Sequence, residues 1–156
     1  MASDYFLDVG IPSESMDKDF KGLQEIQSYA WGVVNTADVT GSGLGSGKAD
    51  WIEMNFAIAC NKASPQLMLH CADGTVIPKA VLYCRKSGGA QEVYLTISWY
   101  DAKITSYNSA GTGENPSDNF TLIGTKVEYE YKFQKPDGTL GAPVKTGYDI
   151  AGNVKL

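Results

Sequence analysis

One histidine and three cysteines are the side chains to consider first for nucleophilic catalysis in this chain. A Ser-His-Asp or Cys-His unit would have to use His70, because the sequence contains no second histidine. Cys71 follows His70 directly, but adjacent positions of a helix point in different directions. His70 also falls near the end of a predicted helix, where a cation is mildly stabilising. We therefore interpret His70 as structural, predict no catalytic residue and expect a protein that is not an enzyme.

Metal and cofactor sites are the next chemistry to consider. Cys60, Cys71 and Cys84 form no C-x-x-C pair, and with His70 they match no zinc spacing, so we predict no metal site. Three cysteines without such a pattern are typical of a protein that folds in a reducing compartment, where cysteine serves as a small apolar residue.

The segment 43–48 is similar to a phosphate-binding loop. Ser42 takes the place of the first glycine, however, and Ala49 takes the place of the hydroxyl residue. A predicted strand follows the loop where a phosphate-binding loop needs a helix. No cofactor is predicted.

Composition limits the class of protein. The chain has 156 residues, of which 43% are hydrophobic and 20% charged, which predicts a single domain spanning residues 1–156. The net charge of -5 and the lack of basic clusters argue against nucleic-acid binding. No apolar run reaches the ~18 residues that a membrane span requires, so no membrane insertion is expected. The N-terminal residues carry no pattern of a secretory signal peptide.

Strands dominate the predicted secondary structure. Residues 51–60 alternate apolar and polar side chains, and so do residues 121–133, where Val127, Tyr129, Tyr131 and Phe133 share one predicted packed face. Glu128 and Glu130 alternate with lysines on the opposite face, which we interpret as solvated and charge-balanced. We count about eight antiparallel strands. Their edges must be managed by closing into a barrel or by pairing with another copy.

The one convincing helix is predicted around residues 65–73. Ser64 can cap its N-terminus, Pro65 suits its first turn, and Gly74 can end it in the left-handed conformation. Its apolar stripe should cover an open side of the sheet structure; the stripe comprises Leu67, Met68, Cys71 and Ala72. Residues 35–50, with four glycines, are predicted to form a long extended loop.

Ordered short motifs run from the first strand almost to the last residue. They include Gly10-Ile11-Pro12-Ser13-Glu14-Ser15, Lys62-Ala63-Ser64-Pro65-Gln66-Leu67, Cys84-Arg85-Lys86 before Gly88-Gly89, Glu128-Tyr129-Glu130-Tyr131, Asp137-Gly138-Thr139-Leu140-Gly141 and Gly147-Tyr148-Asp149. With these motifs the chain resembles the haemolysin-coregulated (Hcp) proteins, the tube subunits of bacterial type VI secretion systems.

The resemblance implies an antiparallel β-barrel of two sheets flanked by the short helix. It implies homo-hexameric rings that stack into a hollow tube, which a contractile sheath expels beneath a spike protein and which can carry effector proteins in its lumen. The protein would reside in the bacterial cytoplasm before firing and then reach the extracellular space or a target cell without a signal peptide. The resemblance also places ring-stacking contacts on one loop, namely Val39, Thr40, Gly41, Ser42, Gly43, Leu44, Gly45, Ser46, Gly47 and Lys48.

Three alternatives remain open from the residues. A monomeric ligand-binding β-barrel would show the same strand pattern but would need a large apolar pocket. A small hydrolase would depend on His70, so the substitution His70→Ala would abolish its activity. A cargo-specialised paralogue acting as an effector carrier or chaperone would be revealed only by effectors that purify with it.

Overall fold

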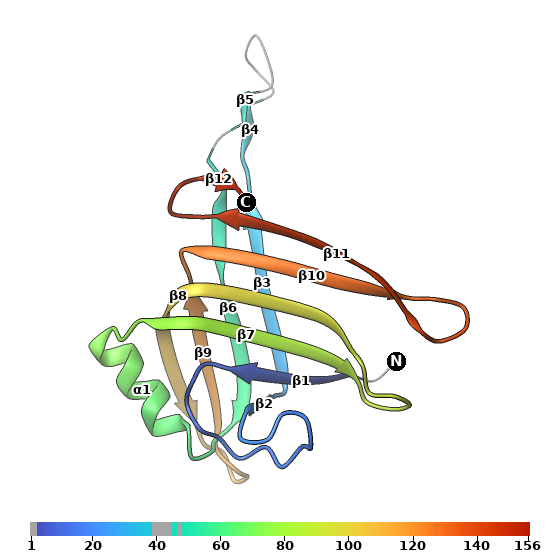
Figure 1. Cartoon of the computed structure of the whole chain (residues 1–156). Helices are drawn as coiled ribbons and strands as arrows, with labels where there is room; N and C mark the ends of the chain where they lie inside the picture. The colour runs from blue at the N-terminus through green and yellow to red at the C-terminus, as the bar shows by residue number, and fades with distance from the viewer. Residues whose placement is uncertain (1–2, 39–44, 47) are drawn as a thin grey trace.

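The computed structural model describes residues 3–38, 45–46 and 48–156 (Figure 1). Seven strands form one antiparallel sheet, sheet A. Its strands lie in the order β12 (Val154–Lys155), β11 (Leu140–Asp149), β10 (Lys126–Gln134), β8 (Val93–Ala110), β7 (Ile77–Lys86), β1 (Ser3–Asp8) and β2 (Gln24–Ile26). A second sheet, sheet B, contains β3 (Ser28–Val34), β6 (Asp50–Ala59), β9 (Ser117–Ile123) and the second half of β8.

Strand β8 belongs to both sheets. Its first half pairs with β7 and β10, and its second half pairs with β9. The strand changes sheet near Asp101, whose φ of 47° lies in the left-handed region. The alternation of residues 92–100 and the shorter apolar pattern of residues 103–107 predict two separate strands, whereas the structure has one continuous strand. The predicted strand 121–133 is instead divided into β9 and β10, because the chain turns at Gly124 and Thr125 beside this corner, where the Thr125 N–H donates to the Tyr100 carbonyl at 2.8 Å.

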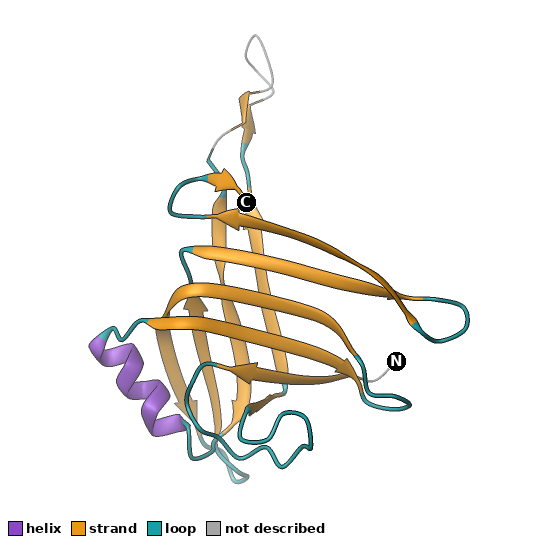
Figure 2. Cartoon of the chain, viewed as in Figure 1, coloured by secondary structure: helices purple, strands orange, loops and turns teal. Residues whose placement is uncertain are grey.

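The mainly antiparallel β fold with one short helix is confirmed (Figure 2). In the described part of the chain it comprises twelve strands rather than about eight, because four of them have only two or three residues. The sheets do not close into a continuous barrel, since β3 pairs with β6 alone among the described strands. The core lies between the two sheets, and its largest fully buried side chains are Trp99, Phe56, Phe120, Leu7, Met54, Ile58, Leu67, Leu82, Ile97 and Leu122.

Helix α1 (Ser64–Asp73) lies against β8 and ends as predicted at Gly74, whose φ is 70°. Its start differs from the prediction. Ala63 occupies the capping position without a side-chain bond, and Ser64 is the first helical residue. The predicted apolar stripe is only partly correct, because Leu67 is buried and Cys71 packs against the core, whereas Met68 and Ala72 are exposed. Within the described residues, no helix has the length and apolarity that crossing a bilayer requires.

Candidate functional site

The histidine and the cysteines considered for catalysis differ in their burial. His70 is half-buried on α1, Cys60 is exposed and Cys71 is half-buried. Cys84 is buried in the core, and this burial raises the pKa of its thiol to about 11, which keeps it protonated and unreactive near neutral pH. Residues 3–38, 45–46 and 48–156 contain no group of three or more histidine, cysteine or carboxylate residues that could hold a metal ion.

The predicted ring-stacking loop is described only in part. Val39–Leu44 and Gly47 lie outside the described residues. Gly45 and Ser46 form β5 (Gly45–Ser46), which pairs with β4 (Ala37–Asp38), and Lys48 is exposed. Figure 1 shows β4 and β5 beyond the ends of β3 and β6, away from the two-sheet body. Strand β6 follows this segment, so the helix that a phosphate-binding loop requires is not in the expected position.

The outer face of sheet A carries charge-balanced polar groups. The Tyr100 hydroxyl donates to a carboxylate oxygen of Glu128, and Lys145 Nζ lies 3.1 Å from the other oxygen. These two contacts lower the pKa of Glu128, with the Tyr100 hydrogen bond as the larger cause. The Lys79 ammonium lies 5.3 Å from the Tyr100 ring centroid. A general acid needs a carboxyl group with a raised pKa, whereas the pKa of Glu128 is lowered and its charge is paired with Lys145. Glu128 therefore fits a charge-balanced surface better than a catalytic role.

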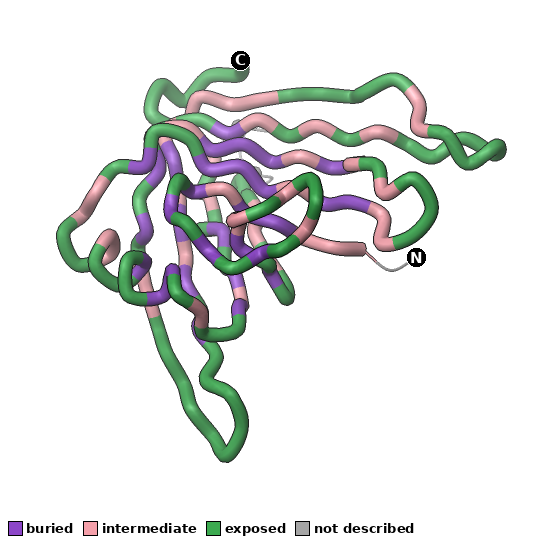
Figure 3. Tube along the Cα trace, turned by 60° about the horizontal axis from the view of Figure 1, so that its bottom comes forward, coloured by how far each residue is buried: buried purple, intermediate pink, exposed green. Residues whose placement is uncertain are grey.

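The opposite face of β10 does not pack as predicted. Val127 is buried at 3% exposure, but Tyr129, Tyr131 and Phe133 are 36%, 44% and 49% exposed. Val144 on β11, the direct neighbour of Tyr131 in the sheet, is 69% exposed. We call Tyr129, Tyr131, Phe133 and Val144 the aromatic ledge. It is exposed because sheet B covers only part of sheet A, and β10 and β11 consist mostly of exposed and half-buried residues (Figure 3).

Aromatic rings join the ledge to the body. Trp31 on β3 lies 5.5 Å from Tyr129 and 5.6 Å from the buried Trp99, measured between ring centroids. Tyr94 meets Tyr131 edge to face at 6.3 Å. Contacts on one side fix the orientation of the rings while the other side stays open. An ordered apolar surface of this kind is typical of a protein–protein contact and is less common on a sheet face that remains in solvent.

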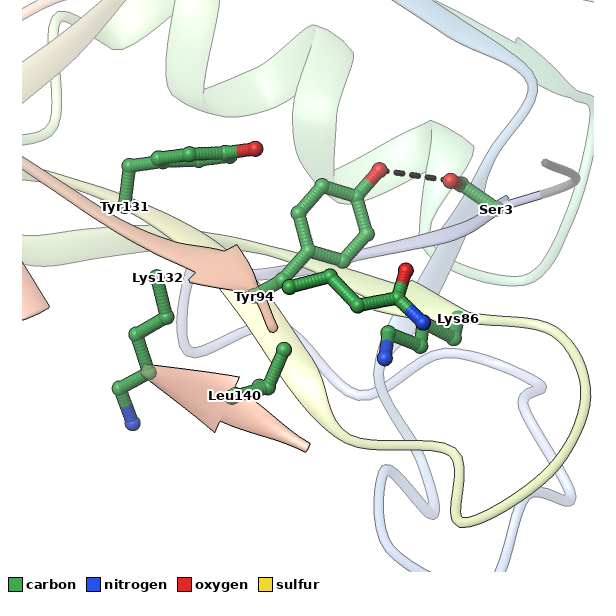
Figure 4. A pocket seen from close by; sticks show the side chains of 7 residues that line it. Ser3, Lys86, Tyr94, Tyr131, Lys132 and Leu140 are labelled. Atoms are coloured by element: carbon green, nitrogen blue, oxygen red, sulfur yellow. Dashed lines mark hydrogen bonds between the residues drawn. The ribbon is translucent and has the colours of Figure 1, made fainter. Parts of the chain in front are cut away.

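A shallow cavity of about 180 Å³ adjoins the ledge where the β7–β8 and β10–β11 hairpins diverge (Figure 4). The Ser3 and Tyr94 hydroxyl oxygens are 2.6 Å apart at its wall, and Lys86 Nζ donates to the Gly138 carbonyl at 3.2 Å. The cavity is smaller than the ~300–1,000 Å³ of typical small-molecule sites. Large core side chains fill the space between the two sheets, where a ligand-binding barrel would hold its ligand.

A sequence profile described as "Type VI secretion system effector, Hcp" matches residues 6–131 of this chain.

The chain belongs to the Hcp family.

It is 34% identical over 163 residues to Protein hcp1 of Pseudomonas aeruginosa, with 99% of each chain covered. Among solved structures it is similar to Hcp1 from Salmonella typhimurium, with 30% identity, a TM-score of 0.84 and full coverage of both chains. A type VI secretion system effector from Yersinia pestis has 28% identity and a TM-score of 0.77, over 94% of this chain and 99% of the other. Hcp family membership supports a type VI secretion tube protein, and Hcp proteins are structural proteins that this system secretes.

Two groups that the structure brings together were missed from the sequence. One is the ion cluster of Arg85 with Asp17, and the other is the buried pair of Ser64 and Asp118. The available signal for the first was an arginine directly after the mainly apolar run of residues 80–84. Its partner could not be identified, because several aspartates lie in polar segments elsewhere in the chain.

Proposed function

We propose that this Hcp-family chain is the repeating subunit of a type VI secretion tube, in which six copies close into a ring and rings stack into a hollow tube. The single observation that carries the proposal is the pair of free edges of sheet A, with the aromatic ledge beside one of them. Ring closure requires two different surfaces on one subunit, each complementary to the other.

The two free edges are in register with each other: following the directly paired residues across the sheet leads from one edge strand to the other. One row runs from Val144 through Tyr131, Leu95, Cys84 and Tyr5 to Ile26, and the next runs from Thr146 through Tyr129, Ile97, Leu82 and Leu7 to Gln24. Among the described strands β2 pairs only with β1, and β12 covers β11 only at Tyr148 and Asp149. Val144–Thr146 is therefore exposed and lacks a strand partner on its outer side at one edge. At the other edge β2 presents its exposed middle residue, Glu25, because Gln24 and Ile26 are buried.

The strand directions also suit pairing between copies. Five successive antiparallel pairings separate β11 from β2, so these two strands run in opposite directions. A second copy rotated about the ring axis would bring its β2 antiparallel to β11 of the first copy. Free edges of this kind are templates for intermolecular pairing. Burial of the aromatic ledge by the neighbouring copy would add hydrophobic stabilisation to the backbone bonds.

Stacking of rings is assigned to the loop Val39–Lys48, which joins β3 to β6. Glycine tolerates a wider range of backbone conformations than other residues, so in this proposal the four glycines allow the loop to fit against the neighbouring ring. The assembled tube works with a contractile sheath and a spike protein, and effector proteins travel in its lumen. The subunit waits in the bacterial cytoplasm and leaves the cell when the system fires. It acts by assembly rather than catalysis.

Light scattering coupled to size-exclusion chromatography tests the ring, with negative-stain images of the main peak. A mass of six subunits and ring-shaped particles is expected. A monomer that persists at high protein concentration would overturn ring closure as an intrinsic property of the chain. Shortening residues 40–47 to a Gly-Gly linker tests the stacking assignment, because rings should remain while short stacks disappear. Unchanged stacking in this variant would remove the assignment to the loop.

A further inference from the structure

Residues 11–23 form a compact segment that folds back on itself before β2. The Ser13 N–H donates to the Gly22 carbonyl at 2.7 Å, and the Gly22 N–H donates to the Ser15 carbonyl at 2.8 Å. Phe20, near the turn, packs against two neighbouring rings of sheet A, with ring centroids 4.7 Å from Phe6 and 5.1 Å from Tyr83. We call residues 11–23 the strap, because they join the outer side of β1 and β7 to the start of β2.

The middle of the strap, at Asp17, is held by a buried arginine. Arg85 on β7 is only 2% exposed, and its guanidinium contacts both carboxylate oxygens of Asp17, with N···O distances of 2.8 and 2.5 Å. Asp4 on β1 lies 3.3 Å from the same guanidinium, and Asp19 lies 3.6 Å away. The Phe6 and Phe20 rings lie within 5.4 Å of its central carbon. This forked, partly desolvated contact is among the stronger kinds of side-chain interaction.

The first part of the strap, Ser13 and Glu14, is held by the residues that lead into α1. A Glu14 carboxylate oxygen accepts the Lys62 N–H at 3.0 Å, and the Ser13 hydroxyl donates to the Asn61 side-chain oxygen at 3.2 Å. The same Asn61 oxygen accepts the Ala63 N–H at 2.8 Å. The strap therefore connects sheet A to the helix, and the chain enters β2 directly after its last residue, Leu23.

Strand β2 depends on this arrangement. It has three residues, and among the described strands it pairs only with β1. Three ladder pairs are a weak hold for an edge strand unless the segment leading into it is fixed. Without the Arg85 charge, three carboxylates would face one another across a small space and would repel the strap from the sheet.

We propose that the strap, closed by the Arg85–Asp17 contact, keeps β2 in register, so that opening the strap prevents ring closure while the two-sheet body stays folded. This inference rests on the proposed ring, in which β2 is one of the two edges that meet. Asp17 is a positioning residue, since it acts on the neighbouring copy only through the strand that the strap holds.

Limited trypsin digestion of the full chain measures strap opening, because Lys18 and Lys21 are exposed within the strap. The test variant is Asp17→Ala. The matched control is Asp19→Ala, the same substitution two residues away at a side chain that is 53% exposed. We expect Asp17→Ala to speed cleavage at these lysines about tenfold or more, as loss of a charge-assisted contact predicts, and Asp19→Ala by less than about threefold. Arg85→Met, which removes the charge but keeps an unbranched apolar side chain, should reproduce the effect of Asp17→Ala.

Light scattering and near-ultraviolet circular dichroism complete the test. Asp17→Ala should be monomeric with the wild-type aromatic spectrum, while Asp19→Ala should still form rings. Unchanged cleavage in Asp17→Ala would show that the Arg85–Asp17 contact does not close the strap. Fast cleavage with intact rings would show that strap closure is not needed for ring assembly. Loss of the aromatic spectrum would show that Asp17 stabilises the whole body, against the proposal. A monomeric wild type would overturn ring closure and the strap's role in it together, while the digestion would still decide whether Arg85 closes the strap.

Discussion

Arg85 and Asp17 are 68 positions apart in the sequence, yet two N–H groups of the arginine meet the two carboxylate oxygens of the aspartate at 2.8 and 2.5 Å. The contact joins the C-terminal end of strand β7 to a polar segment near the N-terminus. It accounts for an almost fully buried cation, because the charge is paired with carboxylates and the guanidinium lies over the Phe6 and Phe20 rings. The same contact leads to the first prediction.

Stability should fall in acid, and Asp17 should account for part of the fall. Its hydrogen bonds from Arg85 hold the pKa of Asp17 well below the ordinary value of 3.8. A lowered folded-state pKa gives stability that is present above the unfolded pKa and is lost as pH falls toward the folded pKa. The free energy of unfolding, measured in urea from about pH 6 down to about pH 3, should therefore decline less steeply in Asp17→Asn than in wild type. Equal slopes would show that the folded and unfolded pKa values of Asp17 are the same.

The corner between β9 and β10 should not tolerate a side chain at Gly124. A Cβ there would lie 2.5 Å from the Tyr100 carbonyl oxygen and 3.2 Å from the Tyr100 nitrogen, and both are backbone atoms. Gly124→Ala should cost about 1–3 kcal/mol in urea unfolding, the range typical of overpacking. Gly113→Ala is the control, because its Cβ would meet nothing within 4 Å, and it should change stability by less than about 0.5 kcal/mol. Similar costs for the two variants would refute the steric explanation.

Helix α1 should depend on one buried hydroxyl. Ser64, 4% exposed, donates to Asp118 Oδ2 at 2.5 Å, and Asp118 is completely buried. Ser64→Ala would leave the buried Asp118 side chain without that donor, at a cost of about 1–3 kcal/mol for a buried polar group that loses its partner.

Thr139→Ala is the matched control for the Ser64 prediction. It removes a hydroxyl that donates to Asp137 at 2.6 Å in an exposed turn, so it should cost less than about 1 kcal/mol. Thermal unfolding followed by circular dichroism compares the two. A smaller loss for Ser64→Ala than for Thr139→Ala would contradict the importance of the buried pair.

The aromatic ledge should matter for assembly more than for folding. Val144→Lys adds a charge at a side chain that is 69% exposed, next to Tyr131, so the monomer should lose less than about 0.5 kcal/mol. Ring formation should nevertheless be abolished, because an unpaired ammonium would be buried against the neighbouring copy. Ile52→Lys on sheet B, at 53% exposure, serves as the control and should leave rings intact. The same light-scattering experiment reads both variants. Rings in Val144→Lys would exclude the ledge from the contact.

Local sequence pattern is enough to identify several elements. Alternation over residues 51–60 predicts β6, in which Met54, Phe56 and Ile58 are all fully buried. Pro65 and Gly74 bracket α1 within one residue of its observed bounds. These features succeed because a period of two or of 3.6 residues, and a left-handed glycine, are decided by the segment itself.

Long-range arrangement decided the rest. Strand β8 passes through both sheets, and residues 121–133 divide at Gly124 because β9 pairs with one half of β8 and β10 with the other. Alternation at Tyr129 and Tyr131 indicated which side chains share a face, but only the extent of sheet B determines that this face is open. The partner of Arg85 likewise emerges only when the strap folds onto β1 and β7. The sequence by itself determined the family, the strands and the helix, because these depend on residue order. The tertiary structure decided which apolar face stays exposed, because exposure depends on what packs above it.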